Sequence, residues 1–296
     1  MKSILFKSIL PVLILLLSVN LNGQDFQGQA YYFSKSKMEL GNWGARMSEA
    51  QKKDVQARLK NRLEKTYVLT FNKEESVFNE EDKLDAMSGA TDSWGKNFAR
   101  GEQYKNVKAN SLIQSQEFYG KRFLVKDKLQ EITWEMGKES KQIGQYLCLK
   151  ATASIPTSEL TWFDFSWQSR GQRGQRGQRG QRAARGDSDR EVEKDTVTLT
   201  PAEPEIEMTE VEAWYTPQIP VGHGPAEYWG LPGLILEVSA GNTTMLCAKI
   251  VMNPKEKITI EAPDKGKEIT KSEYQATLQS KMEEMRNNRG RRRPRG

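Results

Sequence analysis

The string HGPAEYWGLPGLILEV, from His223 to Val238, combines a histidine, a glutamate and two aromatic residues with a Gly-Leu-Pro-Gly turn, and so is the first place to look for chemistry. His223 is the single histidine of the chain. A serine hydrolase would have to use it as the base, yet it lies between two glycines and no G-x-S-x-G elbow precedes it. A zinc site usually needs three or four His, Cys or carboxylate ligands, and one histidine with two widely separated cysteines gives no such pattern. We therefore expect no metal. Because the chain lacks a phosphate-binding G-x-x-x-x-G-K motif, we expect no cofactor either.

A pair of carboxylates is the remaining route to catalysis. Two acidic side chains about 5–9 Å apart in one cleft can hydrolyse a glycosidic bond, and such a pair has no signature in sequence. Among the 39 acidic residues, the candidates are Glu135, Glu139 and Glu227. A periplasmic hydrolase that uses a carboxylate pair is therefore kept as an alternative function.

The Gly-Leu-Pro-Gly string is explained more simply as a structural turn. Pro232 has the φ angle of the first corner of a type II turn, and Gly233 supplies the positive φ of the second corner. The turn would lead into a buried strand. The motif consists of Gly230, Leu231, Pro232, Gly233, Leu234 and Ile235. We expect His223 and Glu227 to lie on the surface of this loop, where the candidate contacts for a ligand or partner are His223, Glu227, Tyr228, Trp229, Trp214 and Tyr215.

The two cysteines, Cys148 and Cys247, leave two alternatives open. In an exported protein the oxidising compartment favours a disulfide bond between them. Each cysteine also falls in an apolar, strand-like run, where a buried free thiol is the other explanation.

The first 23 residues predict export. Lys2 and Lys7 precede an apolar run from Ile9 to Val19, which is shorter than the ~20 residues that span a bilayer, and Gly23 offers a small residue for cleavage. No cysteine lies near this point, so we expect no lipid anchor. No later apolar run is long enough to cross a membrane. We therefore expect a periplasmic or secreted protein that is not a transmembrane protein.

Two arginine-rich segments give the chain its basic charge. An Arg-Gly-Gln repeat runs from Arg170 to Arg182, within a predicted disordered insertion at 157–204, and a disordered arginine-rich tail is predicted at 287–296. The acidic stretch Asp187–Glu212 is expected to be disordered as well. The net charge of +6 becomes −8 when the two signal lysines are set aside together with twelve arginines, six between Arg170 and Arg185 and six between Arg286 and Arg295. Because the body is acidic and the chain exported, we do not expect nucleic acid as a partner.

Two helices are predicted. Ser48 and Gln51 form a capping box at the start of Glu49–Lys65, and we expect its apolar stripe of Val55, Leu59 and Leu63 to pack against a sheet. The second predicted helix closes the chain at 270–288, with Tyr274, Leu278 and Met282 at four-residue spacing.

The remaining patterns favour strands. Strands or strand pairs are expected at 26–38, 65–81, 117–127, 129–136, 141–153, 234–238, 244–252 and 257–263, with a long loop at 85–110. Consecutive strands without intervening helices favour a mainly β (α+β) fold: a curved antiparallel sheet or half-barrel, with a helix in the N-terminal region and a C-terminal helix. The insertion would divide this single domain into residues 24–156 and 205–286.

Three blocks of the sequence resemble a known family. They are YVLTFNKEESVF, WEMGKESKQIGQYLCLKA, and the block from Ala213 to Val238 that contains GLPGLI. The chain is similar to the GLPGLI family of exported envelope proteins. The resemblance implies an exported domain rich in antiparallel strands and no catalytic residues. We expect a non-catalytic binding or assembly factor of the cell envelope, with a lipid, a polysaccharide or an outer-membrane protein as its partner. A carrier of lipid or lipoprotein is a further alternative.

Overall fold

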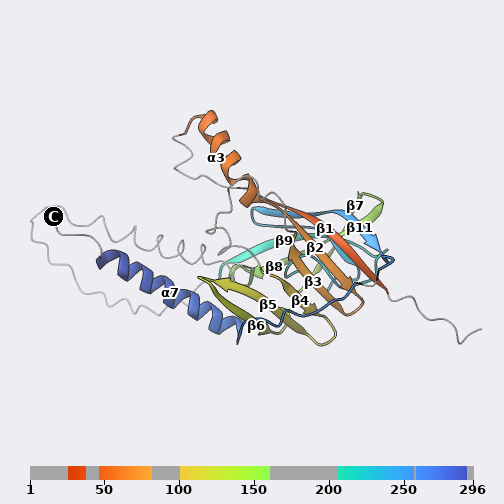
Figure 1. Cartoon of the computed structure of the whole chain (residues 1–296). Coiled ribbons are helices and arrows are strands. Elements are labelled where there is room, and N and C mark those ends of the chain that lie inside the picture. The colour runs from red at the N-terminus through yellow and green to blue at the C-terminus, as the bar shows by residue number, and fades with distance from the viewer. Residues whose placement is uncertain (1–25, 38–46, 82–100, 161–205, 257, 292–296) are drawn as a thin grey trace, which may run out of the picture.

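The main feature of the molecule is one large curved sheet (Figure 1). The structure is a computed structural model, and it describes residues 26–37, 47–81, 101–160, 206–256 and 258–291. The sheet has twelve strands in the order β12-β6-β5-β4-β3-β2-β1-β11-β10-β9-β8-β7, and it does not close into a barrel. All neighbouring strands pair antiparallel except β12 and β6. The predicted fold class, a mainly β curved antiparallel sheet with helices, is confirmed.

The elements have the following bounds. The strands are β1 (Gln27–Ser36), β2 (Glu64–Asn72), β3 (Glu75–Glu80), β4 (Gln103–Asn106), β5 (Ser111–Phe118), β6 (Lys121–Asp127), β7 (Glu135–Ile143), β8 (Tyr146–Pro156), β9 (Met208–Thr216), β10 (Leu234–Ala240), β11 (Thr243–Met252) and β12 (Lys267–Ile269). The helices are α3 (Glu49–Leu63), α5 (Thr157–Leu160) and α7 (Lys271–Arg291). Because β8 pairs with β9, the sheet continues across the gap between residues 160 and 206.

The strand predictions need four corrections. The predicted loop at 85–110 contains β4, whose short run Gln103–Asn106 pairs on both sides. The run 117–127 is the end of β5, a two-residue turn with positive φ at Tyr119 and Gly120, and β6. Most of 129–136 is irregular, and so is 258–263, in place of which the short strand β12 forms next to β6. In each case pairing with a neighbouring strand decided the outcome, and local propensity does not contain that information.

The described residues of the predicted stripe on α3, Val55 and Leu63, are only partly buried, whereas the prediction placed them in a seam against the sheet. The capping box of Ser48 and Gln51 forms, but none of the described side chains of α3 is buried, and the helix projects from the body (Figure 1). The inner face of β1 and β2 is covered instead by the loop between β9 and β10, so the space that this helix would have filled is taken. The helix therefore depends on its own cap and on ion pairs such as Lys52–Glu49.

The boundaries of the predicted disordered segments also shift. The residues 157–160 form α5, with Leu160 buried, and β9 begins at Met208, inside the acidic stretch. The C-terminal helix α7 runs to Arg291, five residues into the predicted tail 287–296, since arginine is a good helix former and its charge suits a helix C-terminus. The predicted signal peptide at 1–23 and the repeat at 170–182 lie outside the described residues.

Two hydrophobic clusters lie on the inner face of the sheet. The larger one joins β1–β3, β8–β11 and the β9–β10 loop, and the smaller one consists of Phe118, Phe123, Val125, Tyr274 and Leu278, where α7 packs on β6. Between them, β3, β4 and β5 present a row of buried polar side chains on the same face, which we call the polar row: Ser76, Gln103, Lys105, Gln114 and Gln116. The strands thus carry a polar layer at a depth where apolar residues are usual.

Candidate ligand-binding pocket

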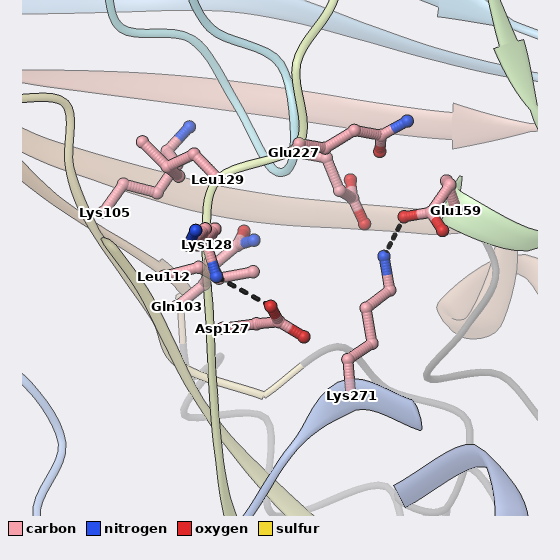
Figure 2. A pocket seen from close by; sticks show the side chains of 10 residues that line it. Gln103, Lys105, Leu112, Asp127, Lys128, Leu129, Glu159, Glu227 and Lys271 are labelled. Carbon is pink, nitrogen blue, oxygen red and sulfur yellow. Dashed lines mark hydrogen bonds and ion pairs between the residues drawn. The ribbon is translucent and has the colours of Figure 1, made fainter. Parts of the chain in front are cut away.

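A pocket opens at one end of the polar row (Figure 2). Its cavity volume is about 270 Å³. It is lined by side chains from β4, β5, the end of β6 and the segment after it, α5, the β9–β10 loop and the start of α7: Gln103, Lys105, Leu112, Asp127, Lys128, Leu129, Gln130, Glu159, Glu227 and Lys271. The lining therefore comes from segments that are up to 168 residues apart in the chain (Gln103 to Lys271).

Lys105 connects the polar row to the β9–β10 loop. Its side chain is fully buried, and its Nζ donates to the backbone carbonyl oxygens of Gly224 at 2.8 Å, Ala226 at 2.7 Å and Tyr228 at 3.1 Å. Three carbonyl acceptors match the three N–H donors of an ammonium group. The charge of Lys105 is thereby held in a cage of oxygens, and it fixes the curvature of the loop that carries Glu227.

The path of the loop places Glu227 at a turn. The Tyr228 N–H donates to the Pro225 carbonyl oxygen at 3.1 Å, and Ala226, between them, has a φ of 52°. A positive φ is uncommon for a residue with a side chain and persists only where the surroundings impose it, as the Lys105 bonds do here. The turn directs the largely buried Glu227 side chain, 7% exposed, toward the pocket (Figure 2).

The Gly-Leu-Pro-Gly string forms a turn, but not the predicted type II turn. The Gly233 N–H donates to the Leu231 carbonyl oxygen at 2.8 Å, which is the three-residue turn that the φ of proline allows around Pro232. Positive φ occurs at Gly230, at 92°, and not at Gly233. Gly233 is required for a different reason: a Cβ there would lie 2.2 Å from the Thr216 carbonyl oxygen.

Two tryptophans hold the segment after β6 against this loop. The Trp229 indole N–H donates to the Gln130 carbonyl oxygen at 2.7 Å, and the Trp134 indole N–H donates to the Trp229 carbonyl oxygen at 2.9 Å. Lys128, Leu129 and Gln130 lie in this segment and form one wall of the pocket. These two bonds explain why a tryptophan stands at position 229, directly before the Gly-Leu-Pro-Gly string.

Gln103 is the feature of the pocket that most requires an explanation. Its side chain is 0% exposed, lines the pocket, and neither its Oε1 nor its Nε2 has a hydrogen-bond partner. The neighbouring Gln114, directly opposite it across β4 and β5, is in the same condition. A buried polar group without a partner costs about 1–3 kcal/mol, so such groups are rare and usually meet water or a ligand.

Charged groups of both signs surround these amides. The Lys271 ammonium pairs with the Glu159 carboxylate and so joins the start of α7 to α5 (Figure 2). The Asp127 carboxylate accepts the backbone N–H of Lys128 at 2.8 Å. With Lys105 and Glu227, the lining has three ammonium and three carboxylate groups. The pocket can therefore bind a polar group of either sign, and its charge is balanced.

The expectation that His223 and Glu227 lie on the surface is wrong. His223 is 0% exposed, beside the Phe71 ring, and its carbonyl oxygen accepts the Ile235 N–H at 3.1 Å. Burial, together with the nearby Lys105 ammonium, lowers the pKa of His223 to about 3. The imidazole is therefore neutral and lies outside the pocket lining, while Glu227 is brought into it. Both residues are buried because the loop folds back onto the sheet.

The other predicted site residues are dispersed. Tyr228 is buried, and Trp214 and Tyr215 point to opposite faces of β9, where Trp214 donates to Glu212 and Tyr215 to the Met136 sulfur. The carboxylate candidates Glu135 and Glu139 are exposed on the edge strand β7, so only Glu227 of the predicted set reaches the pocket.

Of the two alternatives for the cysteines, this structure has the buried free thiols at Cys148 and Cys247. Cys148 lies in β8 and Cys247 in β11, and two strands separate them in the sheet. Burial raises the pKa of Cys148 to about 11 and that of Cys247 to about 12. Both therefore behave as small apolar core residues.

Most pocket residues were not recognised from the sequence. Gln103 and Lys105 lie in the segment interpreted as a loop, where the alternation in EQYKN was the available signal for a strand. Asp127, Glu159 and Lys271 look like ordinary surface charges, and their convergence depends on α5 and α7 meeting at the edge of the sheet. No local pattern marks such a meeting.

The described residues contain neither a cluster of metal ligands nor a helix that could span a membrane. Among them, no three His, Cys, Asp or Glu side chains gather as a metal ion would require. In the same part of the chain, the helices are too short or too polar to cross a membrane.

Comparison with known proteins gives two kinds of similarity. Residues 134–237 match the family model Porph_ging, described as a protein of unknown function, and this stretch includes Gly230–Ile235. No curated protein matches. Two solved structures of PNGF-II, in space groups C2 and P21, are similar with TM-scores of 0.45 and 0.44 and 12% identity. Each alignment covers 86% of this chain but 33% of the PNGF-II chain, so the present chain spans about a third of that protein.

Proposed function

We propose that the protein is an exported, non-catalytic binding protein of the cell envelope that holds a small polar ligand in the pocket. One observation carries this proposal: the fully buried Gln103 lines the pocket with both of its amide atoms unpaired. A ligand that pairs with this amide would recover the free energy that its burial costs. The proposal retains the assignment to the GLPGLI family and the periplasmic or secreted location expected from the N-terminal sequence.

The lining distinguishes this function from that of a lipid carrier. Eight of the ten lining residues are charged or carry an amide, and the two leucines, Leu112 and Leu129, contribute the apolar part. An acyl chain in this space would desolvate the ammonium and carboxylate groups without pairing with them, which is costly. The charged lining therefore supports a polar ligand.

Native mass spectrometry of protein purified from its own envelope tests the proposal. The wild-type protein should retain a small adduct, and Gln103→Leu, which keeps the volume but removes the amide, should lose it. The matched control is Gln116→Leu, since Gln116 is a buried glutamine of the polar row outside the pocket lining. The same adduct on all three proteins, or no adduct on the wild type, would contradict the proposal.

A carboxylate hydrolase is the second candidate function. It is favoured by one observation: Asp127, Glu159 and Glu227 all line the same pocket. In that case Glu227→Gln should abolish turnover of a glycoside or other hydrolysable substrate while the bound substrate remains detectable. Equal turnover by the wild type and this variant, or none by either across a substrate panel, removes the hydrolase candidate and leaves the binding function.

A further inference from the structure

The polar row shows which class of ligand the pocket suits. This inference rests on the proposed function and deepens it. Gln103 and Gln114 are directly opposite in the pairing of β4 and β5, which puts their Cβ atoms about 5 Å apart. Both are fully buried, and the four amide atoms have no hydrogen-bond partner. Gln103 lines the pocket, and Gln114 lies next to Gln103 on the neighbouring strand β5.

A primary amide has two N–H donors and one carbonyl acceptor. Two neighbouring amides therefore match a ligand group that also donates and accepts, and they match poorly a group that does only one. A peptide group has this property, and so does a sugar hydroxyl. A phosphate or sulfate, which only accepts, would leave the glutamine Oε1 atoms unpaired.

The charged groups of the lining narrow the choice of ligand class further. Three ammonium groups, from Lys105, Lys128 and Lys271, and three carboxylates, from Asp127, Glu159 and Glu227, line one cavity. A simple anion would meet the carboxylates and a simple cation would meet the ammonium groups, each with like-charge repulsion. A zwitterion can place each charge near the opposite one. The carboxylate of Glu227 is the one attached to the buried loop, whereas Lys128 is exposed and Lys271 is partly buried.

The cavity also limits the size of the ligand. Its volume of about 270 Å³ equals that of roughly nine water molecules at about 30 Å³ each. A ligand of about two amino-acid residues fits such a volume. No aromatic side chain is among the ten lining residues, so a sugar ring would find no ring face to stack on in the described pocket.

We propose that the pocket binds a short zwitterionic peptide of about two residues. Its peptide group pairs with Gln103, its terminal ammonium group lies toward Glu227, and its terminal carboxylate lies toward Lys128 and Lys271. The Lys271–Glu159 ion pair joins α7 to α5 beside the carboxylate end.

Calorimetric titration of the full chain with L-alanyl-L-alanine tests this assignment. We expect saturable binding by the wild type and a loss of affinity of at least tenfold in Gln103→Leu. Gln116→Leu, the matched buried glutamine outside the lining, should stay within threefold of the wild type. The same dipeptide blocked at both ends by acetyl and amide groups should bind at least tenfold more weakly, because it lacks both charges.

The outcomes separate the ligand class from the proposed function. If glucose or the blocked dipeptide binds as well as or better than the free dipeptide, and Gln103→Leu still abolishes it, the binding function stands and the zwitterion assignment is wrong. If the native protein retains an adduct that Gln103→Leu loses, but the free dipeptide does not bind, the assignment is again wrong. If no probe binds and no adduct is retained, both the zwitterion assignment and the proposed binding function are wrong.

Discussion

The β9–β10 loop and the polar row are both buried, yet the backbone of the loop and the glutamine side chains of the row differ in their hydrogen bonding. In the loop, carbonyl oxygens at Gly224, Ala226 and Tyr228 receive the Lys105 ammonium, and turns around prolines satisfy further backbone groups. In the polar row, the amides of Gln103 and Gln114 have no partner. A buried group that is satisfied contributes to the fold, whereas one left unsatisfied costs stability and indicates a role outside it. The backbone of the loop is architecture, and the glutamines of the row, together with Glu227 of the loop, mark where a ligand is expected.

Removing the link between the two regions should have the largest effect. Lys105→Met keeps the length and apolar stem of the side chain but leaves three buried carbonyl oxygens without their donor. We expect a loss of about 3–5 kcal/mol in the free energy of unfolding, measured by urea denaturation. The control is Lys108→Met, an exposed lysine paired with Glu74, which should change little. A loss in Lys105→Met no greater than in the control would show that the ammonium cage does not hold the loop.

The next largest effect tests the close approach in the Gly-Leu-Pro-Gly string. Gly233→Ala would place a Cβ 2.2 Å from the Thr216 carbonyl oxygen, and a backbone atom cannot easily move away. We expect a loss of about 3 kcal/mol in thermal or urea unfolding. In the control Gly241→Ala, φ is 53° and nothing lies within 4 Å of the added Cβ, so backbone strain alone should cost about 1 kcal/mol. Equal losses in both variants would favour a requirement for backbone freedom at Gly233.

The buried imidazole should make the fold sensitive to acid. The pKa of His223 is about 3 in the folded state, against about 6.5 when unfolded, so below pH 6.5 the unfolded chain binds a proton that the folded one does not. The contribution of neutral His223 to the free energy of unfolding is fully present above pH 6.5, and it is lost as the pH falls toward 3. At pH 5 the loss from this group is about 2 kcal/mol. His223→Gln should unfold with a shallower pH dependence between pH 7 and 4, and an unchanged slope would show that His223 is protonated in the fold.

The smallest expected effect is an increase in stability, and it concerns the polar row itself. Gln114→Leu removes two buried amide atoms that have no partner and keeps a similar volume. We expect the free energy of unfolding to rise by about 1 kcal/mol, measured without ligand. If the free energy of unfolding instead falls by about 1 kcal/mol, ordered water pairs with the Gln114 amide. The row and the loop would then differ less in how their polar groups are paired.

Several elements were predictable because their signals are local. The capping box of Ser48 and Gln51 formed as expected, and so did the hairpin turn at Gly241, because both depend on residues a few positions apart. The packing of α3 was not predictable in the same way. Its apolar stripe is real, but the loop from Ile219 to Leu231 covers the adjoining face of the sheet, and that competition arises between distant segments.

The residues of the pocket likewise divide into those marked by local sequence and those that depend on distant segments. Glu227 was named because it stands beside an unusual string of residues, but its burial was missed, since the string alone gives no sign that the loop folds inward. Gln103 and Lys105 were missed because β4 has four residues and is stabilised by pairing on both sides, which a propensity pattern of that length cannot show.

The sequence by itself determined the strand-rich composition, the caps and turns, the two cysteines and one histidine that argue against zinc chemistry, and the glycines that a tight turn requires. These follow from residue type and spacing over a few positions. Only the tertiary structure decided that Lys105 reaches three carbonyl oxygens more than a hundred residues away, that His223 is neutral, and that Gln103 faces a cavity with balanced charges. Burial, electrostatics and hydrogen-bond pairing depend on which distant segments meet, and in this fold the meeting is set by the order of twelve strands.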